Sequence, residues 1–311
     1  MAKCLVTGGA GFIGSHIVAA LVKRGDQVRV LDNFSTGRLS NLEPVAGQIE
    51  VIRADLCDAA AVEPAVAGVD TIFHQAALAS VPASVADPLA THHACVTGTV
   101  TLLNAARQAQ VRRVVYAASS SAYGNSIWSA KRETDMPMTL SPYAAAKVAA
   151  EWYCQAFYHS YNLETVAIRY FNVFGPRQDP NGAYAAVIPR FICAMVKGER
   201  PTIYGDGQQS RDFVYIDNVV AGNLAAATAP AAAGKLFNIA AGRSYSLLDL
   251  LRELNTILNT RFEPNFEPTR VGDVRDSLAD ISAASQGLNY QPLVSFQDGL
   301  RKTVEYYRTQ A

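Results

Sequence analysis

The feature that most constrains the fold is a glycine-rich turn that joins a short apolar strand to a helix. The segment KCLVTG (3–8) has the composition of a buried strand, and the residues after Gly11 have apolar side chains at helical spacing. Gly8, Gly11 and Gly14 lie three residues apart, and Gly9, Gly11 and Gly14 fit the G-x-G-x-x-G pattern. Such glycines permit a tight turn and a close approach to a diphosphate, which the helix N-terminus attracts. The turn predicts a dinucleotide site.

Strand-like and helix-like segments alternate through the first half of the chain. Further strand candidates are 27–32, 49–55, 70–76, 113–119 and 165–171. This rhythm predicts an α/β fold, a doubly wound parallel sheet with helices on both faces. After about residue 172 the rhythm breaks, and 235–241 reads as a strand that could return to the sheet. We expect a nucleotide domain formed by 1–171 and about 212–241, and a smaller C-terminal α/β substrate lobe formed by 172–211 and 242–311.

Composition excludes several classes of protein. The 311 residues carry 27 basic and 27 acidic side chains, so no basic field favours nucleic acid. The five cysteines show no C-x-x-C pair, which argues against a disulfide framework or a zinc site. No signal peptide or membrane-spanning apolar run is evident. We expect a soluble, cytoplasmic protein without a metal, nucleic acid or membrane partner.

The acid that ends the second strand indicates which dinucleotide binds. Asp32 lies 18 residues after Gly14, where a carboxylate accepts hydrogen bonds from both ribose hydroxyls and repels a 2′-phosphate. The first arginine after Asp32 is Arg38, six residues on, so the pattern favours NAD over NADP. Asp55 and Leu56 end the third strand and are expected to meet the adenine.

A tyrosine and a lysine at helical spacing indicate acid–base chemistry. Tyr143 and Lys147 are four residues apart and project from one face of a helix. An ammonium near a phenol lowers the pKa of the phenol, so Tyr143 could act as a base near neutral pH. Ser119 and Ser120 follow the fifth strand, where a hydroxyl could bridge Tyr143 and a substrate alcohol. Which of these serines is catalytic stays open, and a surface helix pair and a serine-rich turn are the alternatives.

Eight motifs carry a family resemblance. The chain resembles an extended short-chain dehydrogenase/reductase of the UDP-hexose 4-epimerase family, closest to the epimerases that interconvert UDP-N-acetylglucosamine and UDP-N-acetylgalactosamine. The motifs cover nearly the whole chain: TGGAGFIG, LDNFSTG, HQAA, ASSSAYG, SPYAAAK, RYFNVFGPRQDPNGAY, YGDGQQSRDFVYIDNV and GDVRDSLADIS. The resemblance implies a Rossmann sheet, tightly bound NAD and C4 epimerisation of a UDP-sugar through a 4-keto intermediate.

The resemblance also implies a full set of cofactor-binding residues. Besides Asp32, Asp55 and Leu56, these are Gly8, Gly11, Phe12, Ile13, Gly14, Asn33, Ser35, Thr36, Gly37, Gln75, Ala76, Ala77, Ala79, Ser119, Tyr143, Lys147 and Phe171. Lys147 would bind the nicotinamide ribose. Many epimerases have an asparagine near the nicotinamide where this chain has Ala94 or Cys95, so one cofactor contact differs.

The substrate site is implied by the same resemblance. Its residues are Ala79, Ser120, Tyr143, Asn172, Gln178, Ala186, Val187, Tyr204, Arg211, Arg270, Asp273 and Ser277. A small residue at the position of Ser277 admits an acetamido group beside sugar C2, whereas a bulky one restricts the enzyme to plain hexoses. Ala79 stands where the closest relatives tend to have glycine, and its methyl group could shift preference back toward plain hexoses.

Several alternatives remain within and beyond the family. A UDP-galactose 4-epimerase with little N-acetyl activity and a UDP-glucuronate 4-epimerase share these motifs. Dehydratases and decarboxylases are disfavoured, because no carboxylate follows Ser119 before Tyr123. A non-catalytic NAD-sensing protein is a remote alternative, since such proteins commonly lose the tyrosine or lysine. The resemblance further implies a homodimer built on helices 98–110 and 143–161.

Overall fold

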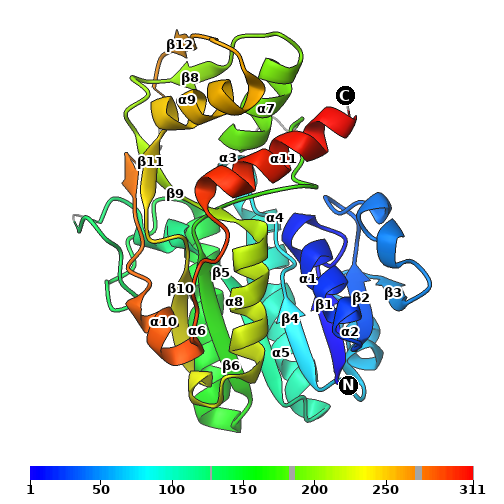
Figure 1. The fold of residues 1–311 in the computed structure, drawn as a ribbon. Helices are drawn as coiled ribbons and strands as arrows, with labels where there is room; N and C mark the ends of the chain where they lie inside the picture. The colour runs from blue at the N-terminus through cyan, green and yellow to red at the C-terminus, as the bar shows by residue number, and fades with distance from the viewer. Residues whose placement is uncertain (127, 182–185, 270–274, 311) are drawn as a thin grey trace.

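A seven-stranded parallel sheet forms the centre of the molecule (Figure 1), in a computed structural model that describes residues 1–126, 128–181, 186–269 and 275–310. The strands follow the order β10-β6-β5-β4-β1-β2-β3. Their bounds are β1 Lys3–Thr7, β2 Gln27–Asp32, β3 Ile49–Arg53, β4 Thr71–His74, β5 Arg113–Ser119, β6 Glu164–Tyr170 and β10 Lys235–Ile239. Every strand predicted for this sheet is therefore confirmed, including the late one that returns beside β6.

The strand order reverses at β1, which pairs with β2 on one side and β4 on the other. The chain runs outward from β1 to β3 and then crosses back to β4. At such a reversal the loops after the two neighbouring strands diverge, and the crevice between them receives ligands. The fold thus places a binding site at the carboxyl ends of β1 and β4.

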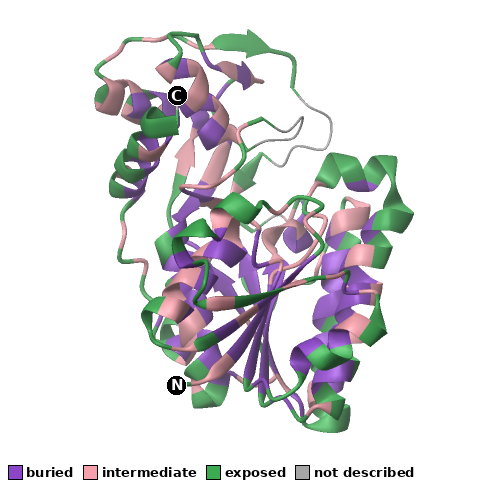
Figure 2. Cartoon of the chain, turned by 90° about the vertical axis from the view of Figure 1, so that its right-hand side faces the viewer, coloured by how far each residue is buried: buried purple, intermediate pink, exposed green. Residues whose placement is uncertain are grey.

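Helices cover both faces of the sheet, because strand residues alternate between two hydrophobic clusters (Figure 2). Cys4 and Val6 pack with Ile17 on one face, whereas Leu5 packs with Leu102 on the other. The first face carries α1 (Phe12–Lys23), α8 (Ile216–Thr228) and α10 (Ser282–Leu288), and the second carries α2 (Ala59–Val66), α5 (Gly98–Gln108) and α6 (Pro142–Tyr161). Both faces of the sheet are buried, as the apolar strands predict.

Short helical segments lead into the functional elements. Ser80 and Asp87 accept backbone N–H bonds at the starts of α3 (Val81–Ala86) and α4 (Pro88–His92), and a π-helical turn (His93–Thr97) then joins α4 to α5. The remaining short turns are η1 (Leu39–Asn41), η2 (Glu43–Val45), η4 (Ser120–Tyr123) and η5 (Pro230–Ala232).

The smaller lobe is built on two short sheets. In the first, β9 (Ser210–Tyr215) pairs with β7 (Asn172–Phe174), β11 (Ser244–Ser246) and β13 (Asp276–Ser277); in the second, β8 (Thr202–Tyr204) pairs with β12 (Asn265–Glu267). Its helices are α7 (Val187–Val196), α9 (Leu247–Leu258) and α11 (Phe296–Gln310). Phe174, Phe213 and Phe296 belong to the same hydrophobic cluster as β1, so the lobe and the sheet share one core.

Candidate active site

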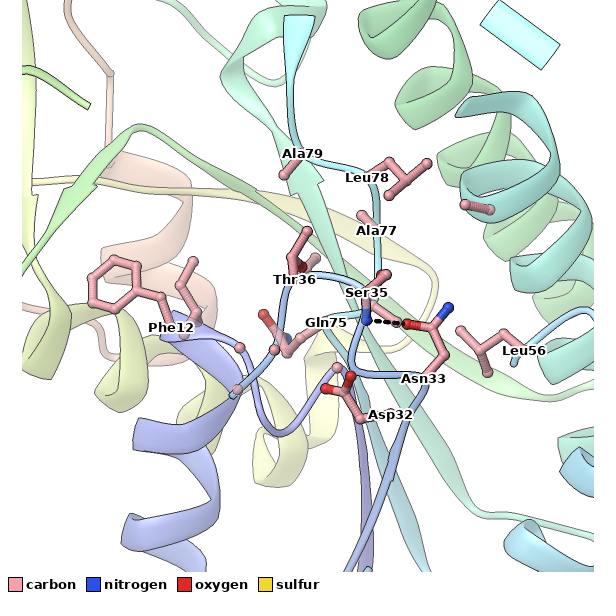
Figure 3. Close-up of a pocket in the computed structure, with 18 of the residues that line it drawn as sticks. Phe12, Asp32, Asn33, Ser35, Thr36, Leu56, Gln75, Ala77, Leu78 and Ala79 are labelled. Atoms are coloured by element: carbon pink, nitrogen blue, oxygen red, sulfur yellow. Dashed lines mark hydrogen bonds between the residues drawn. The ribbon is translucent and has the colours of Figure 1, made fainter. Parts of the chain in front are cut away.

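A cleft of about 360 Å³ opens at the strand reversal and is lined by the loops after β1, β2, β3 and β4 and by α6. Figure 3 shows Asp32 and Asn33 at the end of β2, with the Ser35 N–H bonded to the Asn33 side chain. The cleft-lining residues that the sequence predicted are Gly8, Gly11, Phe12, Ile13, Gly14, Asp32, Asn33, Ser35, Thr36, Gly37, Asp55, Leu56, Gln75, Ala76, Ala77, Ala79, Tyr143 and Lys147.

Gly8, Gly11 and Gly14 of the first turn have different structural roles. Gly8 has φ +66, and a Cβ there would lie 2.6 Å from the backbone nitrogen of Ala76. A Cβ at Gly14 would lie 2.1 Å from the Gly8 carbonyl oxygen, so both glycines are required by packing. In the described chain, a Cβ at Gly11 would meet only that same oxygen, at 3.2 Å. Gly11 instead keeps the N-terminus of α1 open to the cleft, which fits a diphosphate.

The end of β2 holds a fixed carboxylate. Asp32 is 7% exposed, and its two oxygens accept backbone N–H groups from Ala10 at 2.9 Å and Phe34 at 2.8 Å. Each carboxylate oxygen retains a second lone pair for a ribose hydroxyl. Nearby, Asn33 donates to Asp55 at 2.8 Å, and a backbone hydrogen bond from Cys57 lowers the pKa of Asp55. These contacts pre-order the groups predicted to meet ribose and adenine.

Tyr143 and Lys147 lie on one face of α6, toward the cleft. Ser141 caps this helix by accepting the N–H of Ala144. The Lys147 ammonium donates to the Ala117 carbonyl at 2.8 Å, and its pKa is lowered because the side chain is buried. Burial raises the pKa of Tyr143 to about 12, against a smaller lowering by a hydrogen bond with Ser119. In the chain alone the pKa of Tyr143 is therefore raised, because desolvation dominates, and the lowering by Lys147 and a bound nicotinamide stays a prediction.

Ser119 is the serine that contacts Tyr143. Its oxygen accepts the backbone N–H of Ser121 at 3.2 Å and the Ser121 hydroxyl at 2.8 Å. With both acceptor positions used, the Ser119 proton is available to donate to Tyr143. Ser120 begins the short turn η4 after β5 and is half-buried. The serine-rich turn thus orients one hydroxyl toward the reacting tyrosine.

A buried chain of hydrogen bonds supports the floor of the cleft. His74 lies between Thr7 at 2.8 Å and Thr99 at 2.9 Å, and the Thr99 hydroxyl donates to the Cys95 carbonyl at 2.6 Å. Because Thr99 gives its proton to that carbonyl, it accepts from Nε2 of His74, whose Nδ1 then accepts from Thr7. Burial lowers the pKa of His74 to about 3, so the ring is neutral. The chain ties β1 and β4 to the π-helical turn.

Two predicted cofactor residues, Ser119 and Phe171, lie outside the cleft lining. The Phe171 ring is 5% exposed and packs 6.0 Å from the ring of Tyr123. Its neighbour Tyr170 lines the cleft instead and donates to Asn223 at 2.8 Å. Phe171 directly follows the last residue of β6, and its assignment to the cofactor stays a prediction.

The predicted substrate residues beyond Ala79, Ser120 and Tyr143 are spread over the smaller lobe. Arg211 on β9 is the register partner of Ser277 on β13, so these two are neighbours. The others are Asn172 at the start of β7, Gln178 after it, Ala186 and Val187 at the start of α7, and Tyr204 at the end of β8. Arg270 and Asp273 lie outside the described residues.

Arg177 and Asp179 also line the cleft, and the sequence analysis missed them. Both follow β7, more than 130 residues beyond the second strand, so only tertiary structure brings them here. The available signal was the motif GPRQDP, in which two charged residues stand in a Gly/Pro-rich loop.

Two further features bear on partners. Across the described ranges, no group of three or more His, Cys, Asp or Glu side chains is arranged to hold a metal ion. No helix in the described part of the chain is long and apolar enough to cross a membrane.

The fold and the cleft define a Rossmann-type dinucleotide enzyme with a serine, a tyrosine and a lysine at its reacting end. Residues 4–240 match the family model described as the NAD dependent epimerase/dehydratase family. The chain belongs to this family, which confirms the identification as an extended short-chain dehydrogenase/reductase of the 4-epimerase branch and NAD as the cofactor.

Relatives of known name cover almost the whole chain. The chain is 39% identical to a UDP-glucose 4-epimerase of Mycolicibacterium smegmatis over 318 residues, 99% of each chain. It is similar to the structure of a UDP-N-acetylglucosamine 4-epimerase from Methanobrevibacter ruminantium M1 in complex with UDP-N-acetylmuramic acid (TM-score 0.96, 40% identity, 100% and 99% covered). It is also similar to a UDP-glucuronic acid 4-epimerase from Bacillus cereus in complex with UDP-glucuronic acid and NAD (TM-score 0.92, 32% identity, 99% and 100% covered).

Proposed function

We propose that the chain is an NAD-dependent UDP-sugar 4-epimerase that interconverts UDP-N-acetylglucosamine and UDP-N-acetylgalactosamine. The observation that carries this proposal is the contact between Ser119 and Tyr143 at the edge of the dinucleotide cleft, with Lys147 one helical turn away. An alcohol placed against these groups can lose its proton while the carbon that bears it faces the nicotinamide.

NAD, when bound in the cleft, supplies a hydride acceptor that takes hydride from sugar C4 and later returns it to the other face. Tyr143 removes the proton of the 4-hydroxyl and returns it to the oxygen after the 4-keto sugar has turned about its diphosphate linkage. Ser119 bridges the tyrosine and the sugar oxygen once the sugar hydroxyl replaces the Ser121 hydroxyl as a donor to the Ser119 oxygen. Lys147 holds the nicotinamide ribose.

The proton transfer requires a phenol with a lower pKa than the chain alone provides. Burial raises the pKa of Tyr143 to about 12, which opposes its use as a base. A cationic nicotinamide near the phenol would favour the phenolate, and Lys147 would add to this effect once its contact with Ala117 is exchanged for the ribose. In this proposal the enzyme gains its base only when the cofactor is bound in its oxidised form.

Epimerisation fits the site better than elimination or decarboxylation. An elimination at C5 and C6 requires an additional acid beside the strand-end hydroxyl, but Ser120 and Ser121 follow Ser119 here. The oxygen of Ser121 is bonded to Ser119, so this turn supports one hydroxyl and adds no carboxylate.

The choice of sugar rests on the small residue Ser277. It is half-buried on β13 beside Arg211, which we assign to the UDP diphosphate together with Arg270. A serine leaves room for an acetamido group on sugar C2. The nucleotide-sugar site would be completed by Asn172, Gln178, Ala186, Val187, Tyr204 and Asp273, and the sugar pocket by Ala79 and Ser120.

The test is turnover by purified protein without added NAD. UDP-N-acetylgalactosamine, UDP-galactose and UDP-galacturonate are supplied separately, and the anomeric signals are followed by NMR. We expect the acetylated sugar to be converted with the highest kcat/KM. Conversion of UDP-galactose alone would indicate a pocket closed near Ala79, and conversion of UDP-galacturonate alone a uronate epimerase. NAD bound without any turnover would identify a non-catalytic NAD-sensing protein.

We infer that two copies associate through α5 and α6. Trp152, Tyr153 and Tyr161 on α6 are 61%, 43% and 51% exposed, so this apolar helix is not part of a fully buried core in the single chain. The Arg107 guanidinium lies 4.7 Å from the centre of the Tyr161 ring, which links α5 to the same surface. Trp152→Glu should convert a dimer to a monomer in light scattering, whereas Met136→Glu, outside this helix, should not.

A further inference from the structure

The loop after β7 contributes two side chains, Arg177 and Asp179, to the lining of the dinucleotide cleft. This loop, residues 175–181, begins in the smaller lobe and makes three contacts with the nucleotide domain. The Pro176 carbonyl accepts a hydrogen bond from Nε2 of His16 at 3.0 Å. The Arg177 side chain donates a hydrogen bond to the Ser15 carbonyl at 3.3 Å. The Asp179 carboxylate forms an ion pair with Arg38 at 2.5 Å. The loop therefore touches α1 on one side of the cleft and the segment after β2 on the other.

Arg177 is a cation in an unfavourable place. Its side chain is half-buried, its φ is +67 and it contacts the first turn of α1, where the helix dipole is already positive. Within the described residues no carboxylate forms an ion pair with it, because Asp179 is engaged by Arg38. Backbone strain and an uncompensated charge beside a binding cleft are expected where a ligand supplies the missing interaction.

An anion bound at the N-terminus of α1 would compensate the positive charge of Arg177. Arg177 lines the same cleft as Gly11 and Phe12, whose backbone opens toward the diphosphate of the dinucleotide. A guanidinium can bind two phosphate oxygens at once. The arginine assigned to the UDP diphosphate, Arg211, is instead on β9 in the smaller lobe. The cofactor diphosphate is therefore the better partner for Arg177.

We propose that residues 175–181 form a cofactor latch, in which Arg177 binds the NAD diphosphate and the Arg38–Asp179 pair closes the loop over it. The proposal rests on NAD as the cofactor and not on which sugar is the substrate. An epimerase regenerates NAD in every turnover, so it has no need to release the cofactor. The Arg38 and Asp179 side chains are 56% and 47% exposed, so their pair is weak enough to open for loading.

The latch is tested by cofactor retention and exchange. Wild type, Arg177→Gln and Arg177→Lys are purified, bound NAD is counted by release and chromatography, and exchange is followed with isotopically labelled NAD. Arg177→Gln should lower NAD affinity at least about tenfold and speed exchange, and Arg177→Lys, which keeps the charge, should lie between. Arg301→Gln on α11, far along the chain and ion-paired to Asp298, is the matched control and should behave as wild type.

The closing pair is tested separately. Asp179→Asn should speed NAD exchange by a few-fold with less effect on affinity than Arg177→Gln, since it leaves the diphosphate contact in place. Full NAD content and an unchanged exchange rate in Arg177→Gln would overturn the proposal. A raised KM for the UDP-sugar with unchanged NAD retention would also overturn it, by assigning Arg177 to the substrate diphosphate. Circular dichroism of each variant shows whether it is folded. If the wild type bound NAD but converted no UDP-sugar, the proposed epimerase activity would be contradicted, whereas the test of the cofactor latch would still be valid.

Discussion

The two halves of the active site are built in different ways. The cofactor half takes its residues from the ends of consecutive parallel strands, so Gly8, Asp32, Asp55 and Gln75 meet because β1 to β4 share one edge. The proposed substrate half would take its residues from short strands that are far apart in the chain, such as Asn172, Arg211 and Ser277 around β9. The residues of a site at one sheet edge can be predicted from local sequence patterns, because each of them ends a strand. The residues of a site between short strands come together only through pairing of distant segments.

This difference has a functional meaning. In the cofactor half, carboxylates and glycines are already held by backbone contacts, which suits a cofactor that stays bound. In the proposed substrate half, the small side chain of Ser277 leaves room, which suits a sugar that must rotate. Changes in the first half should affect binding of NAD and the chemistry, and changes in the second should affect which sugar is accepted.

The largest effect is expected for Tyr143→Phe, which removes the proton-transferring group and leaves the ring. We expect kcat to fall by about 10²–10⁴-fold, the usual contribution of general acid–base catalysis. Bound NAD should remain at wild-type level, because the cofactor contacts persist. Tyr153→Phe, on an exposed part of the same helix, is the control. Full turnover by Tyr143→Phe would contradict the proposed chemistry.

Two substitutions in the glycine turn should separate an effect on NAD binding from an effect on packing. Gly11→Ala should weaken NAD binding by about tenfold or more with a small change in melting temperature, because the added methyl group enters the cleft. Gly14→Ala should also destabilise the fold by about 1–3 kcal/mol, since its methyl group collides with the Gly8 carbonyl. Calorimetric titration and thermal unfolding of both variants check this. Equal loss of stability in the two would contradict the division of tasks.

Ser277→Tyr tests the substrate half. A bulky ring should reduce kcat/KM for UDP-N-acetylgalactosamine at least about tenfold relative to UDP-galactose, because the acetamido group loses its space. NAD content should not change. Ser244→Tyr, exposed on β11 of the same small sheet, is the control. An unchanged ratio of the two sugars would remove Ser277 from the pocket.

The last prediction concerns stability in acid and not activity. The pKa of His74 is about 3 in the fold, below its ordinary value of 6.5, because the ring is buried. A depressed pKa contributes stability that is present above about pH 6.5 and is lost as pH falls toward 3, by up to about 1.4 kcal/mol per pH unit. His74→Asn should be less stable at neutral pH, with a shallower loss in acid, and exposed His159→Asn should follow wild type. Denaturant unfolding across this range measures the slopes.

The sequence predicted the parts of the site that follow from local pattern. The strands of the main sheet follow from apolar runs, and 18 of the 29 cleft-lining residues were predicted, most of them as what the family resemblance implies. The place of Tyr170 in the cleft lining was not predicted, because a strand with apolar residues on both faces does not show which side chain faces the ligand.

Other features depend on burial and on distant contacts. The raised pKa of Tyr143 could not be anticipated from its spacing to Lys147, because it comes mainly from desolvation of the phenol in the folded chain. The contacts of Arg177 with Ser15 and of Asp179 with Arg38 join segments more than 140 residues apart. No local pattern connects such positions, so the latch emerges only from the folded structure.

The most direct test of the account follows the hydrogen on the sugar carbon. UDP-N-acetylgalactosamine that carries deuterium at C4 is incubated with the purified protein in ordinary water without added NAD, and the product is examined by NMR and mass spectrometry. Transient oxidation at C4 by a retained cofactor predicts UDP-N-acetylglucosamine with deuterium still at C4. Loss of the label to solvent would instead indicate proton abstraction from carbon, and would contradict the assignment of Tyr143 as the base for the 4-hydroxyl.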